Sequence, residues 1–146
     1  MEATVPDIEV TTDTSRFDIE TIHTFLAKSY WASAIPREVV ERAIAHSLCF
    51  GALDGNRQVG FARVVSDRAT FAYVCDVFVL ESHRGLRVGK SLMAAIMAHP
   101  DLQGLRRIML FTRDAHGLYA QYGFGAAQYP ERLMEVLDPD PYGAGG

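Results

Sequence analysis

The sequence DVFVLESHRGLRVGKSL, Asp76–Leu92, changes from an apolar strand pattern through a short basic turn to a helix pattern. The first N–H groups of such a helix have no partner within the helix, and the helix dipole adds partial positive charge at the same end. A phosphate or pyrophosphate is the natural ligand of that end. His83, Arg84, Arg87 and Lys90 add up to four basic groups. The stretch therefore predicts an anion-binding cradle for a phosphate-bearing cofactor.

Composition limits the class of protein. The 146 residues suffice for one domain with a hydrophobic core, and the formal charge of −4, from 14 basic and 18 acidic residues, does not favour nucleic acid as a partner. The sequence shows neither an apolar run of roughly 18 residues nor a secretory signal pattern at its N-terminus. Cys49 and Cys75 lie in apolar runs and are expected to be reduced core thiols. We therefore expect a cytoplasmic protein that does not bind membranes.

The order of predicted elements indicates an α/β (α+β) layered domain with a mixed sheet. Hydrophobic periodicity and turn signals predict strands at Ile8–Thr12, Leu48–Leu53, Gln58–Val65, Phe71–Leu80 and Arg106–Thr112, helices at Phe17–Lys28, from Pro36, at Gly89–Ala98 and at Ala115–Tyr122, and a closing hairpin of Phe124–Gln128 and Leu133–Leu137. The strand at 106–112 follows a helical crossover and should run parallel to 71–80, in a mostly antiparallel sheet. Residues 1–137 are thus predicted to form one domain of about seven strands and four helices, before a flexible, Pro/Gly-rich tail at 138–146.

Two short segments link the chain to a known superfamily. The turn Arg84–Gly89, RGLRVG, resembles the [Q/R]-x-x-G-x-[G/A] pattern of the acetyl-CoA loop in GNAT acyltransferases, with Arg87 in place of the central Gly. The segment Leu118–Phe124, LYAQYGF, resembles the LYxxxGF segment of the same superfamily. The two motifs occur in family order and spacing, and together with the element order the resemblance covers roughly Glu9–Leu137.

The resemblance implies a GNAT-like sheet whose strands 71–80 and 106–112 part at their C-terminal ends, with acetyl-CoA in the gap. No metal is expected, because the sequence has no His/Cys cluster with metal-ligand spacing. The turn would then contact the pyrophosphate, and backbone groups of the strand end would bind the pantetheine arm and polarise the thioester carbonyl. The cofactor-binding residues by this match are Val77, Phe78, Val79, Arg84, Gly85, Leu86, Arg87, Val88, Gly89 and Lys90. The alternative to the cradle is a solvated basic turn that binds nothing.

Arg87 departs from the family pattern. If its backbone has a positive φ, a side chain there costs roughly 1–2 kcal/mol, and a charge-assisted contact to a cofactor phosphate would offset that cost. The loop could equally hold Arg in ordinary geometry, or the substitution could weaken cofactor binding. We hypothesise that binding is retained, with an added phosphate contact.

Two residues are predicted to carry the chemistry. The resemblance makes Tyr119 the general acid, because the Tyr of the family's LYxxxGF segment protonates the departing thiolate; packing in the core is its alternative role. Asp76 is the one ionisable group in an apolar strand, where a carboxylate would bind the substrate cation or take its proton. Its alternative role is a structural pairing with backbone groups or with an arginine such as Arg63 or Arg113.

Three further residues are expected beside the acceptor. Tyr30 and Trp31 lie in the loop between the first two predicted helices, which covers the acceptor side of the cleft in this fold. Their rings could stack on a substrate or hold a cation, and the alternative is a hydrophobic plug. Asp114 follows the strand at 106–112, where the family often has Asn, and its alternative role is to cap the next helix.

We interpret the sequence as an N-acetyltransferase that passes the acetyl group of acetyl-CoA directly to a primary amine, through a tetrahedral intermediate whose oxyanion is held by strand N–H groups. Cys75 is not expected to be a nucleophile, since direct transfer needs none. Two alternatives stay open: a non-catalytic acetyl-CoA sensor or assembly module, and a transferase of the same fold that uses another acyl-CoA. The expected partner is a small-molecule or peptide amine, and a homodimer through the C-terminal strands is implied by the resemblance alone.

Overall fold

Alternating side chains build the antiparallel part of the sheet. The computed structural model describes residues 6–143, and in it β2 (Leu48–Asp54) and β3 (Arg57–Ser66) pair as the predicted hairpin. β1 (Ile8–Thr11) and β4 (Phe71–Val79) add antiparallel on either side of this pair. Alternate residues of a strand face opposite sides of the sheet, and apolar side chains therefore line both faces.

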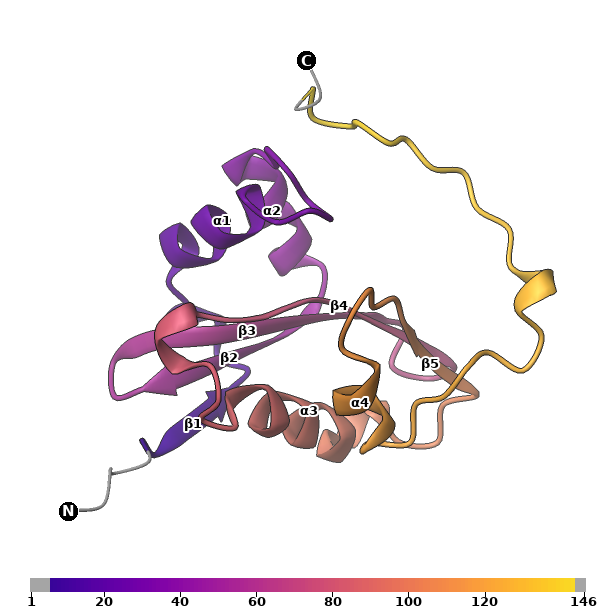
Figure 1. Cartoon of the computed structure of the whole chain (residues 1–146). Helices are drawn as coiled ribbons and strands as arrows, with labels where there is room; N and C mark the ends of the chain where they lie inside the picture. The colour runs from indigo at the N-terminus through magenta and orange to yellow at the C-terminus, as the bar shows by residue number, and fades with distance from the viewer. Residues whose placement is uncertain (1–5, 144–146) are drawn as a thin grey trace.

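The sheet ends in a parallel pair that separates along its length. β5 (Arg107–Leu110) lies parallel to β4, which gives the order β1-β2-β3-β4-β5 (Figure 1). The pairing of these two strands begins at Phe71 and ends at Val74, so that within residues 6–143 Cys75–Val79 of β4 continue without a strand neighbour on the β5 side. The predicted mixed sheet, and its parting between these two strands, are confirmed.

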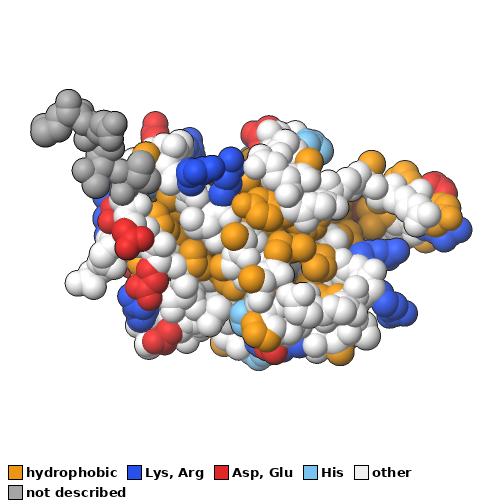
Figure 2. All heavy atoms as spheres, turned by 90° about the horizontal axis from the view of Figure 1, so that it is seen from below, with side chains coloured by type: hydrophobic (Ala, Val, Ile, Leu, Met, Phe, Trp, Pro, Cys, Tyr) orange, Lys and Arg blue, Asp and Glu red, His pale blue; other side chains and the backbone are white. Residues whose placement is uncertain are grey.

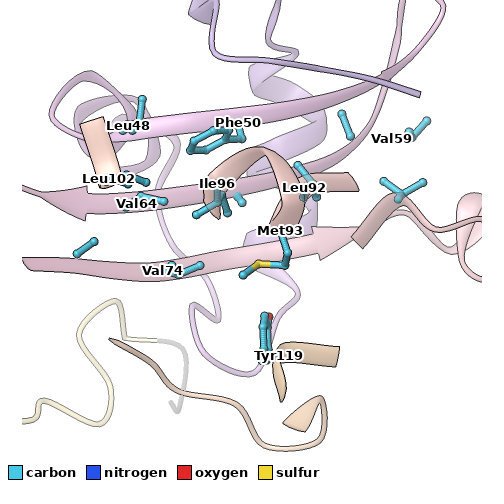
Figure 3. Packing of buried hydrophobic residues seen from close by; sticks show 14 residues of the cluster. Leu48, Phe50, Val59, Val64, Val74, Leu92, Met93, Ile96, Leu102 and Tyr119 are labelled. Carbon is cyan, nitrogen blue, oxygen red and sulfur yellow. The ribbon is translucent and has the colours of Figure 1, made fainter. Parts of the chain in front are cut away.

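Helices cover both faces of the sheet. Figure 1 shows α1 (Ile19–Ala27) and α2 (Arg37–Ala45) on one face, and α3 (Val88–Ala98) and α4 (His116–Ala120) on the other. One hydrophobic cluster lies under each layer. In the larger one, side chains of α3 pack on those of the strands (Figure 3): Leu92, Met93 and Ile96 on Phe50, Val64 and Val74.

Gly60 of β3 lies where α3 begins its contact with the sheet. A Cβ at this position would lie 2.9 Å from Cγ1 of Val88, 3.2 Å from Cβ of Ala52 and 3.2 Å from the carbonyl oxygen of Phe78. Gly60→Ala is therefore expected to lower the free energy of unfolding by about 2 kcal/mol, because extra volume in a closed core forces its neighbours apart. Urea unfolding measures this change. Gly117→Ala is the control, since nothing lies within 4 Å of a Cβ there, and an equal loss in both variants would contradict the packing argument.

The predicted closing hairpin is wrong. Neither Phe124–Gln128 nor Leu133–Leu137 forms a strand, so residues 6–143 contain five strands and not about seven. The chain turns away after α4 at Gly123, where φ is +91°, and runs past the sheet without pairing with β5 (Figure 1). Pro130–Arg132 forms a short 3-10 helix, η4, within this segment. A strand needs a neighbouring edge for its N–H and C=O groups, and this segment has none within the described chain.

The predicted domain at 1–137 and tail at 138–146 both extend past the described residues, since 1–5 and 144–146 lie outside them. Tyr142, within the predicted tail, packs against the hydrophobic cluster under α1 and α2. None of the described helices has the length and apolar character that crossing a membrane requires.

Candidate active site

The turn between β4 and α3 presents backbone groups where the sequence predicts an anion. η2 (Glu81–His83) follows β4, and α3 begins at Val88, whose buried side chain anchors the helix start on the core. Gly85 and Arg87 both have left-handed backbone, with φ of +79° and +66°. The first N–H groups of α3 have no partner within the helix, which fits the predicted cradle for phosphate oxygens.

Basic side chains frame this turn. Arg84 and Arg87 are exposed, and Lys90 is half-buried in the first turn of α3. His83 differs from the expectation, because it is 8% exposed and its Nε2 lies 2.8 Å from Oδ2 of Asp54 at the end of β2. His83 therefore ties the turn to the sheet, and the cradle keeps the other three basic side chains.

Arg87 is the N-terminal cap of α3, with φ 66° and ψ 18°. Its carbonyl oxygen accepts hydrogen bonds from the N–H of Ser91 at 3.0 Å and from the hydroxyl of Ser91 at 3.1 Å. Ordinary backbone geometry, one of the alternatives left by the sequence, is therefore excluded. The cost of about 1–2 kcal/mol for a side chain in the left-handed region applies here, and its offset by a phosphate contact stays a prediction.

Arg87→Gly separates the backbone cost of the positive φ at Arg87 from the predicted contact between its side chain and a phosphate. The free energy of unfolding should stay equal or rise by up to about 1 kcal/mol, because glycine adopts a positive φ without strain. The affinity for acetyl-CoA should fall by about 10-fold or stay equal, because a charge-assisted contact is lost. Arg84→Gly is the control, since φ at Arg84 is −66° and only the charge effect is expected. Urea unfolding and calorimetric titration measure the two quantities, and a large gain in affinity for Arg87→Gly would contradict the hypothesis.

A bulge in β4 explains why the strands part. From Phe61 to Arg63, β3 advances by two residues while the paired β4 advances by three. The extra length contains Asp76, whose φ is +53°. A bulge bends the strand that carries it, and this one comes just after Val74, the last residue of β4 that pairs with β5.

The carboxylate of Asp76 has two partners. One oxygen accepts a hydrogen bond from Nε of Arg63 at 2.8 Å, and the other accepts one from Nε1 of Trp31 at 2.9 Å. The side chains of Asp76 and Arg63 are 11% and 20% exposed. This is the structural pairing with Arg63 that the sequence left open, and it also fixes the Trp31 indole beside the bulge.

The parted strands line a cleft of about 650 Å³. Tyr119 forms part of its wall, is 9% exposed and packs with the larger hydrophobic cluster (Figure 3). Burial raises the pKa of the Tyr119 phenol, and the charges of Tyr30 and Asp114 raise it further. The cleft lining brings together nine of the predicted residues, from distant parts of the chain: Tyr30, Trp31, Asp76, Val77, Phe78, Val79, Arg84, Asp114 and Tyr119. The rest of the cradle, residues 85–90, lies outside this lining.

A second cavity, of about 770 Å³, lies against α1. Phe25, Tyr30, Trp31 and Arg113 line both cavities. The guanidinium of Arg113 lies 3.9 Å from the centre of the Tyr30 ring, and Phe25 stacks on Phe78 with ring centroids 4.1 Å apart. The sequence did not indicate Phe25 or Arg113 as site residues, although Arg113 comes directly after the predicted strand at 106–112.

This geometry bears on two roles considered from the sequence: Asp114 as the cap of a helix and Cys75 as a nucleophile. Asp114 is exposed and does not cap α4, because the cap is Ala115, whose N–H donates to Oγ1 of Thr112 at 2.9 Å. Cys75 also lines the cleft, and burial raises the pKa of its thiol to about 12. The thiol is therefore protonated at neutral pH and is a poor nucleophile.

Known proteins resemble this chain along most of its length. A family model described as the acetyltransferase (GNAT) family matches residues 16–124. A crystal structure from Xanthomonas campestris pv. campestris, described as belonging to the GNAT family, is 56% identical with a TM-score of 0.93, over 96% of this chain and 99% of that one. A Gibberella zeae protein with the provisional name of an acetyltransferase is 29% identical over 148 residues, which cover 86% of this chain and 82% of that protein. A Clostridium acetobutylicum structure with acetyl-CoA shares the fold, with a TM-score of 0.63 and 12% identity, over 90% of this chain and 95% of that one.

Proposed function

The chain belongs to the acetyltransferase (GNAT) family, and from this premise we propose that it transfers the acetyl group of acetyl-CoA directly to a primary amine. The observation that carries the proposal is a single cleft that joins the edge of the cradle, the free edge of β4 and the phenol of Tyr119. The acetyl-CoA described with the Clostridium acetobutylicum protein supports the same co-substrate.

The residues present fit this co-substrate. The start of α3, with Arg84, Arg87 and Lys90, would hold the pyrophosphate through N–H groups and positive charge. The edge of β4 from Cys75 to Val79 has no strand neighbour on the cleft side among the described residues. Amide groups of an extended ligand can pair with such an edge as an added strand would. Backbone groups of Val77–Val79 would thereby hold the pantetheine arm.

Tyr119 is proposed as the general acid. The amine nitrogen forms a bond with the thioester carbonyl carbon, the carbon–sulfur bond breaks, and the sulfur takes the phenol proton of Tyr119. N–H groups of the β4 edge would hold the negative oxygen formed during transfer. An alkylammonium with a pKa near 10.4 is about one part in a thousand neutral at pH 7, so a base or water must also take a proton from the amine.

The acceptor is proposed to enter from the cavity beside α1. Asp18 and Glu20 line this cavity together with Lys28 and Arg113, so the cavity offers carboxylates to a charged amine but has no net charge of its own. Tyr30 and Trp31 would stack on the acceptor or face its charge. The two hydrogen bonds of Asp76 support a positioning role through Trp31, beside the predicted role as the proton acceptor.

Calorimetric titration tests the co-substrate first. We expect acetyl-CoA to bind with a micromolar dissociation constant, with CoA binding to the same site and ATP failing to reproduce the heat. Release of free CoA thiol with a panel of amines then tests transfer. Binding without turnover on any amine would favour the sensor alternative, and the absence of binding at millimolar acetyl-CoA would overturn the assignment of the cradle.

A further inference from the structure

The cavity beside α1 carries charges of both signs. Two acidic side chains, Asp18 and Glu20, and two basic ones, Lys28 and Arg113, line it. Figure 2 views the opposite side of the sheet, where hydrophobic side chains gather in the middle of the face instead. Binding sites match the charges of their ligands. A cavity with both signs of charge therefore suits a ligand that is itself cationic at one group and anionic at another.

The two signs of charge lie at opposite ends of this cavity. Glu20, Thr24 and Lys28 follow one another at intervals of four residues, so they share one side of α1, and all three line the cavity. The helix advances by about 12 Å between Glu20 and Lys28. At the acidic end, the carboxylate of Asp18 already accepts hydrogen bonds from the N–H and the hydroxyl of Thr21, at 3.2 and 2.8 Å. The basic end lies where α1 finishes.

Arg113 lies at the basic end, on the boundary with the cleft between β4 and β5. Its guanidinium carbon is 3.9 Å from the centre of the Tyr30 ring, and both residues line the cavity and the cleft. Among residues 6–143, neither Arg113 nor Lys28 forms an ion pair with a carboxylate. A guanidinium over an aromatic ring keeps its N–H donors at its edge, where they match the two oxygens of a carboxylate. The boundary of the two spaces is therefore suited to bind a carboxylate.

We propose that the acceptor is an α-amino acid, whose carboxylate binds Arg113 while its amino group enters the cleft; this inference rests on the proposed acetyl transfer. A carboxylate held at the boundary leaves only a short path to the cleft, and a single carbon separates the two groups of an α-amino acid. The exposed carboxylate of Asp114 lines the cleft and would face the ammonium group. The side chain of the amino acid would extend along α1 towards Glu20.

The transfer to an α-amino acid needs no further reactant. The nitrogen forms a bond with the thioester carbonyl carbon, and the carbon–sulfur bond breaks. Of the three protons on the ammonium group, one stays on the amide nitrogen and one replaces the phenol proton that Tyr119 gives to the sulfur. The third passes to a base or to water. The products are an N-acetyl amino acid and the free thiol of CoA.

Matched acceptors test the proposal on the wild-type protein. Thiol release from acetyl-CoA is measured with the common α-amino acids that carry a primary amine, each beside its α-amide and its decarboxylated amine. At least one amino acid should have a kcat/KM about 10-fold or more above that of both analogues, because neither analogue offers a carboxylate to Arg113.

The possible failures of this panel are distinguishable. If an amide or a decarboxylated amine is used as well as every amino acid, the α-amino acid is the wrong class and acetyl transfer still stands. A preference for β- or γ-amino acids would also overturn the proposal, because the carboxylate would then bind farther from the cleft. Turnover of no compound at all, with acetyl-CoA bound, would overturn the proposed transfer and this inference with it.

Substitutions of Arg113 test the contact directly. Arg113→Gln should raise the KM of the preferred amino acid by about 10-fold to 100-fold, since a charge-assisted pair is lost, and that of its α-amide by less than about 3-fold. Arg113→Glu should reverse the order and favour the decarboxylated amine. Arg132→Gln is the matched control, because Arg132 lies 3.7 Å over the ring of Tyr129 but lines neither space, and should leave both KM values unchanged.

The amino acid and its amide decide what Arg113 does. An equal rise in KM for both would mean that Arg113 only holds the Tyr30 ring in place, and the proposal would be wrong. An equal rise in Arg132→Gln would overturn it too, because the effect would then not depend on the cavity. Calorimetric titration with acetyl-CoA accompanies each variant, and its affinity should stay within about 2-fold of wild type, as expected if the co-substrate site is intact.

Discussion

Tyr119→Phe is expected to lower kcat by about 100-fold to 1000-fold with acetyl-CoA and an accepted amine. Removal of a general acid costs a factor of this order, because the thiolate must then leave without a proton. Only the hydroxyl is deleted, and the ring keeps its edge-to-face contact with Phe124 at a centroid distance of 6.1 Å. The affinity for acetyl-CoA and the free energy of unfolding should therefore change little. Thiol release measures the rate, and calorimetry measures the affinity.

Tyr122→Phe is the matched control, in the same segment of the chain. The hydroxyl of Tyr122 donates a hydrogen bond to the carbonyl oxygen of Lys90 at 3.0 Å. Its loss should cost about 1 kcal/mol of stability and less than about 10-fold in kcat. A similar fall in kcat for both variants would mean that the general-acid role of Tyr119 is wrong and that the segment acts through its position.

The pH dependence of kcat also tests Tyr119 as the general acid. Burial raises the pKa of Tyr119 above its ordinary value near 10. A raised pKa keeps the acid in its protonated form, so the general acid is lost only above about pH 10. The kcat profile of the wild-type enzyme should therefore rise from pH 6 to pH 9 without a decline, as more of the amine becomes neutral. A decline between pH 7 and 9 would point to a different acid.

The sequence was sufficient for the parts of the fold that depend on local chemistry. The turn from Arg84 to Gly89 was predicted from the positions of its glycines. The hairpin of β2 and β3 was predicted from alternating apolar and polar residues on both sides of a turn. Both features are determined within a few residues of sequence. The predicted parting of the strands came from resemblance alone. Its cause, the bulge at Asp76, carries no sequence signal, since an aspartate with a positive φ looks like any other strand aspartate.

Side-chain partners and the chain end were harder to predict. His83 was counted as a cradle residue, because its sequence position cannot reveal that Asp54 lies 2.8 Å from its ring. Leu133–Leu137 was predicted as a strand, since its residue types suit one. Whether such a segment pairs is decided by the edge that lies beside it, and within residues 6–143 Leu133–Leu137 pairs with none.

Asp76→Asn is expected to lower the free energy of unfolding by about 2–3 kcal/mol, which urea unfolding measures. The substitution removes the charge that faces Arg63 at 2.8 Å and leaves a guanidinium that is only 20% exposed without its counter-ion. Asparagine keeps an oxygen for the Trp31 indole and tolerates the positive φ of +53°. Asp76→Ala should cost about 1 kcal/mol more, because alanine also strains this backbone.

Three comparisons decide what the Asp76 carboxylate does. In a double-mutant cycle, Asp76→Asn with Arg63→Gln should cost less than the sum of the single changes by about 1–2 kcal/mol, as expected for a direct pair. Glu41→Gln, which breaks an exposed pair with Arg37, should change stability by less than about 0.5 kcal/mol. If Asp76 only positions Trp31, Asp76→Asn should raise the KM of the acceptor and keep the shape of the kcat profile with pH. A fall in kcat of about 100-fold or more in Asp76→Asn, with the KM of the acceptor unchanged, would instead identify Asp76 as the proton acceptor.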